Sequence, residues 1–134
     1  DLANLINEAA LFAARYGDKK VEQNHLDLAK DKIMMGPERK SMIMTDEQKR
    51  ITAYHEAGHA IVGLNLEKCD PVYKATIIPR GGALGMVVSL PEIERLSWHK
   101  NECKQKLAMT MAGKAAEILK WGIKIADVTI FFSK

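Results

Sequence analysis

The sequence predicts an α+β fold that is mainly α-helical. Apolar residues recur at helical spacing in several long segments, and cap and stop residues mark the ends of these segments. One stretch rich in β-forming residues contains a two-glycine turn. With 134 residues, of which 47% are hydrophobic and 28% charged, the chain has the length and composition of one modest globular domain.

The first predicted helix covers the opening segment DLANLINEAALFAAR. Asp1 is its expected N-cap, because a short acidic side chain accepts hydrogen bonds from the first turn, and Gly17 is its expected stop. The expected apolar face comprises Leu2, Leu5, Ile6, Ala9, Ala10 and Ala13. The chain opens on Asp1 without a methionine, so we expect it to be a piece of a longer polypeptide.

A second amphipathic helix is expected from about Asn24 to Met35, and the following Gly36 and Pro37 end its pattern. His25 lies near its start and is interpreted as a surface residue. Residues 37–44 read as a connector. A third helix then begins with a capping box, in which Thr45 is the cap and Gln48 follows three residues later.

The third helix carries the stretch TAYHEAGHAIV, in which His55, Glu56 and His59 form the pattern H-E-x-x-H. Histidines four residues apart share a helix face, so both imidazoles can reach one ion, and Glu56 points to a neighbouring sector. Zinc suits this pattern because it lowers the pKa of a bound water to about 7, where a nearby carboxylate can take the proton.

The alternative is two solvated histidines that happen to sit one turn apart. A chance H-E-x-x-H in a chain of this composition is on the order of one per cent, so zinc is favoured. Gly58 interrupts the helix at a cost of roughly 1 kcal/mol against alanine. We therefore expect it to let another element pack closely against this helix.

Beyond this helix the sequence predicts a β-hairpin and a last helix. The strands are expected in VYKATIIP and ALGMVVSL, with RGG as the turn between them. The last helix is expected from about Ser97 to Lys120. Its predicted buried stripe comprises Cys103, Leu107, Met111, Ala115 and Ile118.

Charge and cysteine content argue against several other functions. The formal net charge is only +3, and the basic residues form no run longer than a doublet, so nucleic-acid binding is not expected. Cys69 and Cys103 are far apart and form no C-x-x-C pair, which argues against a zinc knuckle or a disulfide scaffold. No apolar run approaches the roughly 20 residues that span a bilayer.

Taken together, these stretches resemble the FtsH family of membrane-anchored, ATP-dependent zinc metalloproteases of bacteria and organelles. The resemblance is carried by DLANLINEAALFAAR, AKDKIMMGPERKSM, TAYHEAGHAIVG, VYKATIIPRGGALGM and AGKAAE, in the order and spacing of the family. It implies that residues 1–36 are the C-terminal end of an AAA+ ATPase lid. Residues 37–134 would be the N-terminal part of a zincin-like helical peptidase domain with a short β-hairpin, its tail diverging from about residue 118.

The resemblance also implies a function. The parent protein would be a zinc-dependent metalloendopeptidase that degrades unfolded or membrane proteins, with His55 and His59 as zinc ligands and Glu56 activating a zinc-bound water. ATP would bind only to the full-length parent, because this chain contains no G-x-x-x-x-G-K-[ST] loop.

For partners and location, the resemblance implies polypeptide substrates and a homo-hexameric parent anchored in a membrane. This region would lie on the cytoplasmic or organelle-matrix side. The strand around Tyr73 to Ile78 is a hypothetical edge to which an extended substrate adds.

A catalytic zinc normally takes three protein ligands, and the motif supplies two. In the family the third is an aspartate in a Gly- and Ser-rich stretch, but the tail ILKWGIKIADVTIFFSK departs from that pattern. The candidates are Asp127 and Glu117, and Glu117 could instead orient a histidine from behind. One hypothesis is that a reading-frame change replaced the tail. The alternative function is therefore a truncated or degenerate remnant without catalytic activity.

Overall fold

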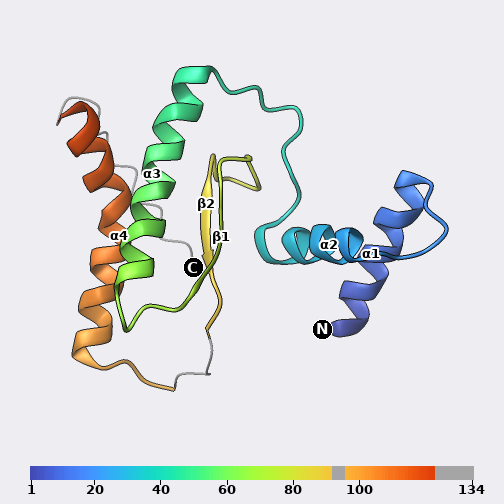
Figure 1. The fold of residues 1–134 in the computed structure, drawn as a ribbon, viewed down its shortest axis with the longest axis horizontal. Coiled ribbons are helices and arrows are strands. Elements are labelled where there is room, and N and C mark those ends of the chain that lie inside the picture. Colours follow the sequence, from blue (N-terminus) through green and yellow to red (C-terminus); the bar gives the residue numbers. More distant parts are fainter. Residues whose placement is uncertain (92–95, 123–134) are drawn as a thin grey trace. The chain divides into compact units, whose positions relative to one another are not determined.

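The computed structural model describes residues 1–91 and 96–122 (Figure 1). Along the chain, the described elements are α1 (Leu2–Tyr16), α2 (Gln23–Met35), α3 (Asp46–Asn65), β1 (Val72–Thr76), β2 (Met86–Ser89) and α4 (Lys100–Trp121). The predicted α+β, mainly α-helical class is confirmed. In the described part of the chain, no helix is both long enough and apolar enough to cross a membrane.

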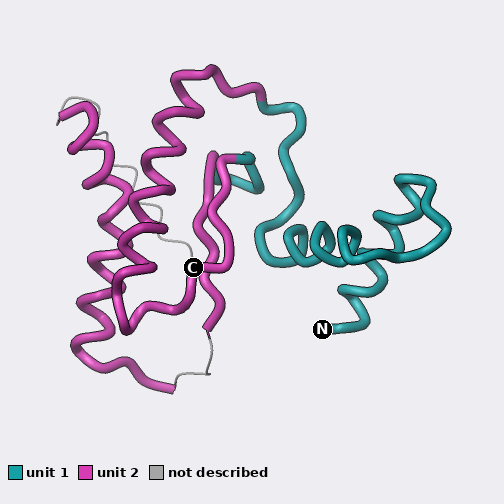
Figure 2. The backbone as a smooth tube through the Cα atoms, in the orientation of Figure 1, with its two compact units in different colours: residues 1–42, 78–83 teal, residues 43–77, 84–134 magenta. Residues whose placement is uncertain are grey.

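The chain divides into two compact units, which Figure 2 shows in different colours. The first unit comprises Asp1–Met42 together with Ile78–Ala83. The second comprises Ile43–Ile77 and the described part of Leu84–Lys134, and it contains α3, α4 and both strands.

In the first unit, α1 and α2 pack against each other through small side chains. The Asp1 side chain accepts a hydrogen bond from the Ala3 N–H at 2.9 Å, and Gly17 ends α1 in the left-handed conformation, so both predicted ends are confirmed. Of the predicted apolar face, Ala9 and Ala13 are buried, whereas residues such as Leu2 stay exposed. Alanine side chains are small and allow the two helices to approach closely, so the buried part of this face consists of alanines.

His25 is fully buried, so its interpretation as a surface residue was wrong. Its Nδ1 accepts a hydrogen bond from the Glu22 N–H at 3.0 Å, which closes a capping box at the start of α2. The ring also stacks on Tyr16, with 6.1 Å between ring centroids. The imidazole is buried because it caps the start of α2. The sequence pattern did not indicate this role.

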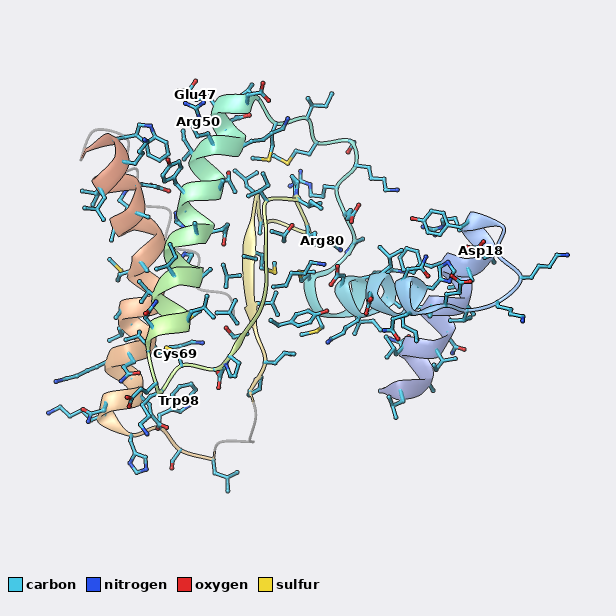
Figure 3. The ribbon with its side chains drawn as sticks, viewed as in Figure 1. Asp18, Glu47, Arg50, Cys69, Arg80 and Trp98 are labelled. Atoms are coloured by element: carbon cyan, nitrogen blue, oxygen red, sulfur yellow. The ribbon has the colours of Figure 1, made fainter. Side chains whose placement is uncertain are left out.

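The hairpin turn belongs to the first unit, where Arg80 holds it (Figure 3). The Arg80 guanidinium is 5% exposed and donates to the Gly36 carbonyl at 2.9 Å and to Glu38 at 2.8 Å, with Asp31 at 4.0 Å. Buried charge is tolerated when it is paired and hydrogen-bonded, as here. Arg80 and Ala83 also exchange backbone hydrogen bonds, so the predicted turn at RGG is confirmed.

In the second unit, α3 and α4 lie side by side (Figure 1). The predicted capping box of α3 is confirmed, because the Gln48 N–H donates to Thr45 and the Thr45 N–H donates to Gln48. A Cβ added to Gly58 would lie 2.5 Å from the Ala112 carbonyl oxygen and 2.8 Å from the Ala116 Cβ. Gly58 thus lets α4 approach closely, as the sequence predicted.

The buried face of α4 differs from the prediction. The residues of α4 that are buried are Met109, Ala112 and Gly113, whereas Leu107 and Met111 of the predicted stripe are 64% and 56% exposed. The small residues allow the α4 backbone to reach α3 at Gly58, and the bulkier stripe would keep the helices apart. The predicted stripe was therefore wrong, because close helix packing selected the small face.

The hairpin places its strands along α3. β1 and β2 pair antiparallel, with Thr76 opposite Met86 and an irregularity between Val72 and Lys74. The Val72 side chain lies near Gly63 of α3, where an added Cβ would be 3.1 Å from Val72 Cγ2. The predicted hairpin is confirmed, but its strands are shorter than expected because the turn uses the residues around Arg80.

Candidate active site

The two histidines of the H-E-x-x-H pattern meet at one point. His55 and His59 lie one turn apart on α3, and their Nε2 atoms are 3.1 Å from each other. Their ring centroids are 4.7 Å apart and the rings are nearly perpendicular, at 78°. The shared helix face predicted from the spacing is therefore present.

The other nitrogen of each ring has a partner on α4. Nδ1 of His55 lies 2.6 Å from a carboxylate oxygen of Glu117, and Nδ1 of His59 lies 2.7 Å from the Met109 carbonyl oxygen. A carbonyl and an ionised carboxylate only accept hydrogen bonds, so each Nδ1 carries the hydrogen. When each ring is neutral, its Nε2 is therefore the unprotonated nitrogen.

This pair of Nε2 atoms has the geometry of a metal-binding pair. Two acceptor lone pairs at 3.1 Å cannot satisfy each other, and a shared cation would satisfy both. Zinc–nitrogen bonds of about 2.0–2.1 Å at a tetrahedral angle would put the two nitrogens roughly 3.3 Å apart. The arrangement of His55 and His59 thus fits zinc, and the partners at Nδ1 fix the ring orientation.

The environment keeps His59 in the form that binds a metal. Burial lowers the pKa of His59, and the neighbouring His55 lowers it further, whereas the Met109 carbonyl and Glu117 raise it. The net shift is downward, which favours the neutral ring. A metal ligand must be unprotonated at the coordinating nitrogen.

Glu56 is buried next to this pair. It is 8% exposed, and burial raises its pKa while the nearby His55 lowers it, with a net upward shift. Gly85, just before β2, lies against it, because an added Cβ would be 2.7 Å from Glu56 Cγ. A carboxyl group that accepts a proton more readily than usual is suited to taking one up and returning it.

An open pocket of about 250 Å³ lies beside Glu56 and His59. Its other lining residues are Val87, Lys106, Met109 and Thr110. Val87 belongs to β2, and the last three belong to α4. The pocket thus opens next to the buried carboxylate of Glu56.

The structure brings together four of the predicted site residues: His55, Glu56, His59 and Glu117. Glu117 lies at the Nδ1 side of His55, away from the paired Nε2 atoms. Asp127 falls outside the described residues. Among residues 1–91 and 96–122, no group of three or more His, Cys, Asp or Glu side chains is arranged to hold a metal ion.

Two contributors were missed from the sequence. Gly113 of α4 faces the two imidazoles, and Met109 supplies a backbone carbonyl to His59. Their signal lay in the segment MTMAGKAAE, where small residues follow one another, but spacing alone did not show which face of α4 turns toward α3. A backbone carbonyl carries no signal in the residue type.

Two histidines one turn apart on a helix, with a buried glutamate beside them, are the features of the H-E-x-x-H class of metallopeptidases. The chain belongs to peptidase family M41, whose model matches residues 42–129. This match confirms the family expected from the sequence. It extends past residue 118 and includes Asp127.

Curated relatives agree with this assignment. The chain is 57% identical over 122 residues to the ATP-dependent zinc metalloprotease FtsH of Rickettsia bellii (strain RML369-C), covering 91% of this chain and 19% of the relative. It is 55% identical to the protein of the same name from Caulobacter vibrioides (strain NA1000 / CB15N), covering 91% and 20%. The corresponding protein of Haemophilus influenzae (strain ATCC 51907 / DSM 11121 / KW20 / Rd) is 57% identical, with 91% and 19% covered. The chain thus spans about a fifth of the length of these relatives.

Proposed function

We propose that this chain forms the first part of a zinc-dependent endopeptidase domain. The observation that carries the proposal is the pair of Nε2 atoms of His55 and His59, 3.1 Å apart, with each Nδ1 held by α4. Membership of peptidase family M41 supports the same activity.

In this proposal, His55 and His59 hold the ion through Nε2. Glu117 accepts the Nδ1 hydrogen of His55 and so fixes its tautomer and orientation, which supports an orienting role over a ligand role. Asp127 remains the proposed third ligand, within the family match. Bound zinc would supply a Lewis acid that polarises a peptide carbonyl and makes water more acidic.

Glu56 is the proposed general base and acid. It takes the proton of the water that attacks the peptide carbonyl, and it returns a proton to the departing amine. Burial of Glu56 raises its pKa and supports both steps, because the carboxyl group then holds a proton more readily.

The pocket supports an extended polypeptide as substrate. Its lining includes Val87 of β2 and none of its lining residues comes from β1. We therefore propose the β2 side of the hairpin for the substrate, and the edge around Tyr73 to Ile78 stays the alternative. An extended segment there would lie beside Glu56 and His59.

For the parent protein, we propose an ATP-dependent, membrane-anchored protease that degrades unfolded or membrane proteins as a homo-hexamer. The relatives are named ATP-dependent zinc metalloproteases, and this chain spans a fifth of their length. Residues 1–36 would be the end of the AAA+ lid and residues 37–134 the start of the peptidase domain. Both would lie on the cytoplasmic or organelle-matrix side, with ATP bound elsewhere in the parent.

The test is the substitution Glu56→Gln in the full 134-residue chain reconstituted with zinc. Gln keeps the size of the side chain but cannot take up a proton, so cleavage of an unstructured fluorogenic peptide should fall by about 10²–10⁴-fold with zinc content unchanged. Glu47→Gln, at an exposed position earlier on α3, should cleave like the wild type.

Undiminished cleavage in Glu56→Gln would contradict the assigned role. A wild-type chain that takes up no zinc after reconstitution and cleaves nothing would instead establish the alternative, a remnant without catalytic activity.

A further inference from the structure

Gly113 is the point at which α4 comes nearest to the paired imidazoles. A Cβ added there would lie 2.5 Å from His59 Nε2 and 2.7 Å from His55 Nε2. Its third neighbour would be His55 Cδ2, at 2.8 Å. The three nearest atoms to this missing side chain therefore all belong to the two proposed metal ligands.

Neither backbone conformation nor helix packing accounts for glycine at this position. Gly113 lies inside α4 and is not among the described glycines with positive φ. At Gly58, by contrast, the nearest atoms to an added Cβ are the backbone oxygen of Ala112 and the Cβ of Ala116, so that glycine serves helix packing. Gly58 of α3 faces α4, and Gly113 of α4 faces α3. Gly58 is needed for helix packing, whereas Gly113 leaves room for the imidazoles.

A methyl group at position 113 would collide with the paired imidazoles. Zinc binds nitrogen at about 2.0–2.1 Å, so an ion shared by both Nε2 atoms must lie within that distance of each. A carbon atom 2.5 and 2.7 Å from the same two atoms is closer than van der Waals contact allows, so at least one imidazole would have to turn away. The space that Gly113 leaves thus lets both rings keep their Nε2 atoms at the spacing that a shared ion needs.

We propose that Gly113 is a positioning residue whose missing side chain lets His55 and His59 hold their Nε2 atoms together for a shared metal ion. The inference rests on the proposed zinc function and adds a determinant of metal binding that donates no ligand. Because it acts by steric exclusion alone, replacing it should affect metal binding and metal-free stability in different ways.

Gly113→Ala should leave the metal-free chain folded. Alanine favours a helix interior over glycine, and the atoms in its way are the tips of histidine side chains, which can rotate aside. Rotation of either imidazole, however, separates the Nε2 pair on which metal binding depends. Gly58→Ala should instead lower stability, because its methyl group meets the backbone of α4.

The experiment compares the wild type, Gly113→Ala and Gly58→Ala as full 134-residue chains. Zinc affinity is measured by competition with a chromophoric chelator, and thermal unfolding is followed by circular dichroism in excess chelator. For Gly113→Ala we expect zinc affinity to fall by more than the 10–100-fold typical of losing an outer hydrogen-bond partner. Its metal-free unfolding temperature should equal or exceed that of the wild type, whereas Gly58→Ala should unfold at a lower temperature.

Two results would overturn the inference while leaving the proposed function intact. Gly113→Ala that binds zinc as tightly as the wild type would show that the position needs no clearance. A metal-free Gly113→Ala chain whose unfolding temperature falls below that of the wild type, as is expected for Gly58→Ala, would show that the glycine serves packing. If the wild type itself binds no zinc, the proposed function fails and this inference fails with it, and the wild-type titration alone identifies that case.

Discussion

Both units hold histidines by hydrogen bonds at Nδ1, but they use them in different ways. In the first unit, both ring nitrogens of His25 meet groups of the surrounding chain: Nδ1 accepts from the Glu22 N–H at 3.0 Å, and Nε2 lies 3.0 Å from an Asp18 carboxylate oxygen. In the second unit, His55 and His59 engage only Nδ1 in this way and leave their Nε2 atoms facing each other.

The difference separates a structural histidine from a functional pair. A ring whose Nδ1 accepts a hydrogen bond from a helix end carries its hydrogen on Nε2, so it contributes to folding and offers no ring lone pair to a ligand. Two rings that are oriented through Nδ1 and turn their Nε2 atoms toward each other are prepared for a cation, at some cost in lone-pair repulsion. Burial alone would have singled out His25, which is 0% exposed.

The substitution His59→Ala should have the largest effect among the tests of this difference between His25 and the His55–His59 pair. The effect is expected on zinc affinity. The substitution removes one of two proposed ligands, so zinc affinity should fall by roughly 10³-fold or more, since each ligand shares in a total binding free energy of about 10–16 kcal/mol. A chelator-competition titration measures it. His99→Ala, at an exposed position before α4, is the matched control and should bind zinc normally. Equal losses in both variants would contradict the assignment.

A smaller effect on zinc is expected in Glu117→Gln. The amide is a weaker acceptor for the Nδ1 hydrogen of His55, so the ring is held less firmly and zinc affinity should fall by about 10–100-fold. The same titration measures this change. Complete loss of zinc would indicate that Glu117 is itself a ligand, and unchanged affinity would remove its orienting role.

The smallest expected effect is that of His25→Ala, and it should appear only in stability. Loss of the hydrogen bond to the Glu22 N–H should lower the free energy of unfolding by about 1–2 kcal/mol, because that donor loses its partner at the start of α2. Urea denaturation in excess chelator measures it. Zinc affinity should stay at the wild-type value. A lower zinc affinity would contradict the distinction between a structural His25 and the metal-binding pair His55 and His59.

Much of the local structure could be predicted from the sequence. The caps at Asp1 and Thr45, the stop at Gly17 and the shared face of His55 and His59 all depend on neighbours within a few residues, and the structure has each of them. The role of Gly58 was also predictable, because a mid-helix glycine is costly unless close packing requires it.

Features that depend on distant parts of the chain could not be predicted. The face of α4 that is buried was decided by how closely small residues let it approach α3, and periodicity showed an apolar stripe elsewhere. Gly113 and the Met109 carbonyl acquire their roles only through that contact. Arg80 is buried because acidic and carbonyl groups some 40 residues earlier in the chain surround it.

The central claim is that His55 and His59 hold a metal through unprotonated Nε2 atoms. Its most direct test is ¹⁵N-resolved NMR of the histidine side chains during a zinc titration of the full chain. We predict that both rings are Nδ1–H tautomers without metal, and that one equivalent of zinc shifts their Nε2 signals and leaves those of His25 unchanged. Nε2–H tautomers at His55 and His59, or Nε2 signals that zinc does not move, would contradict the account.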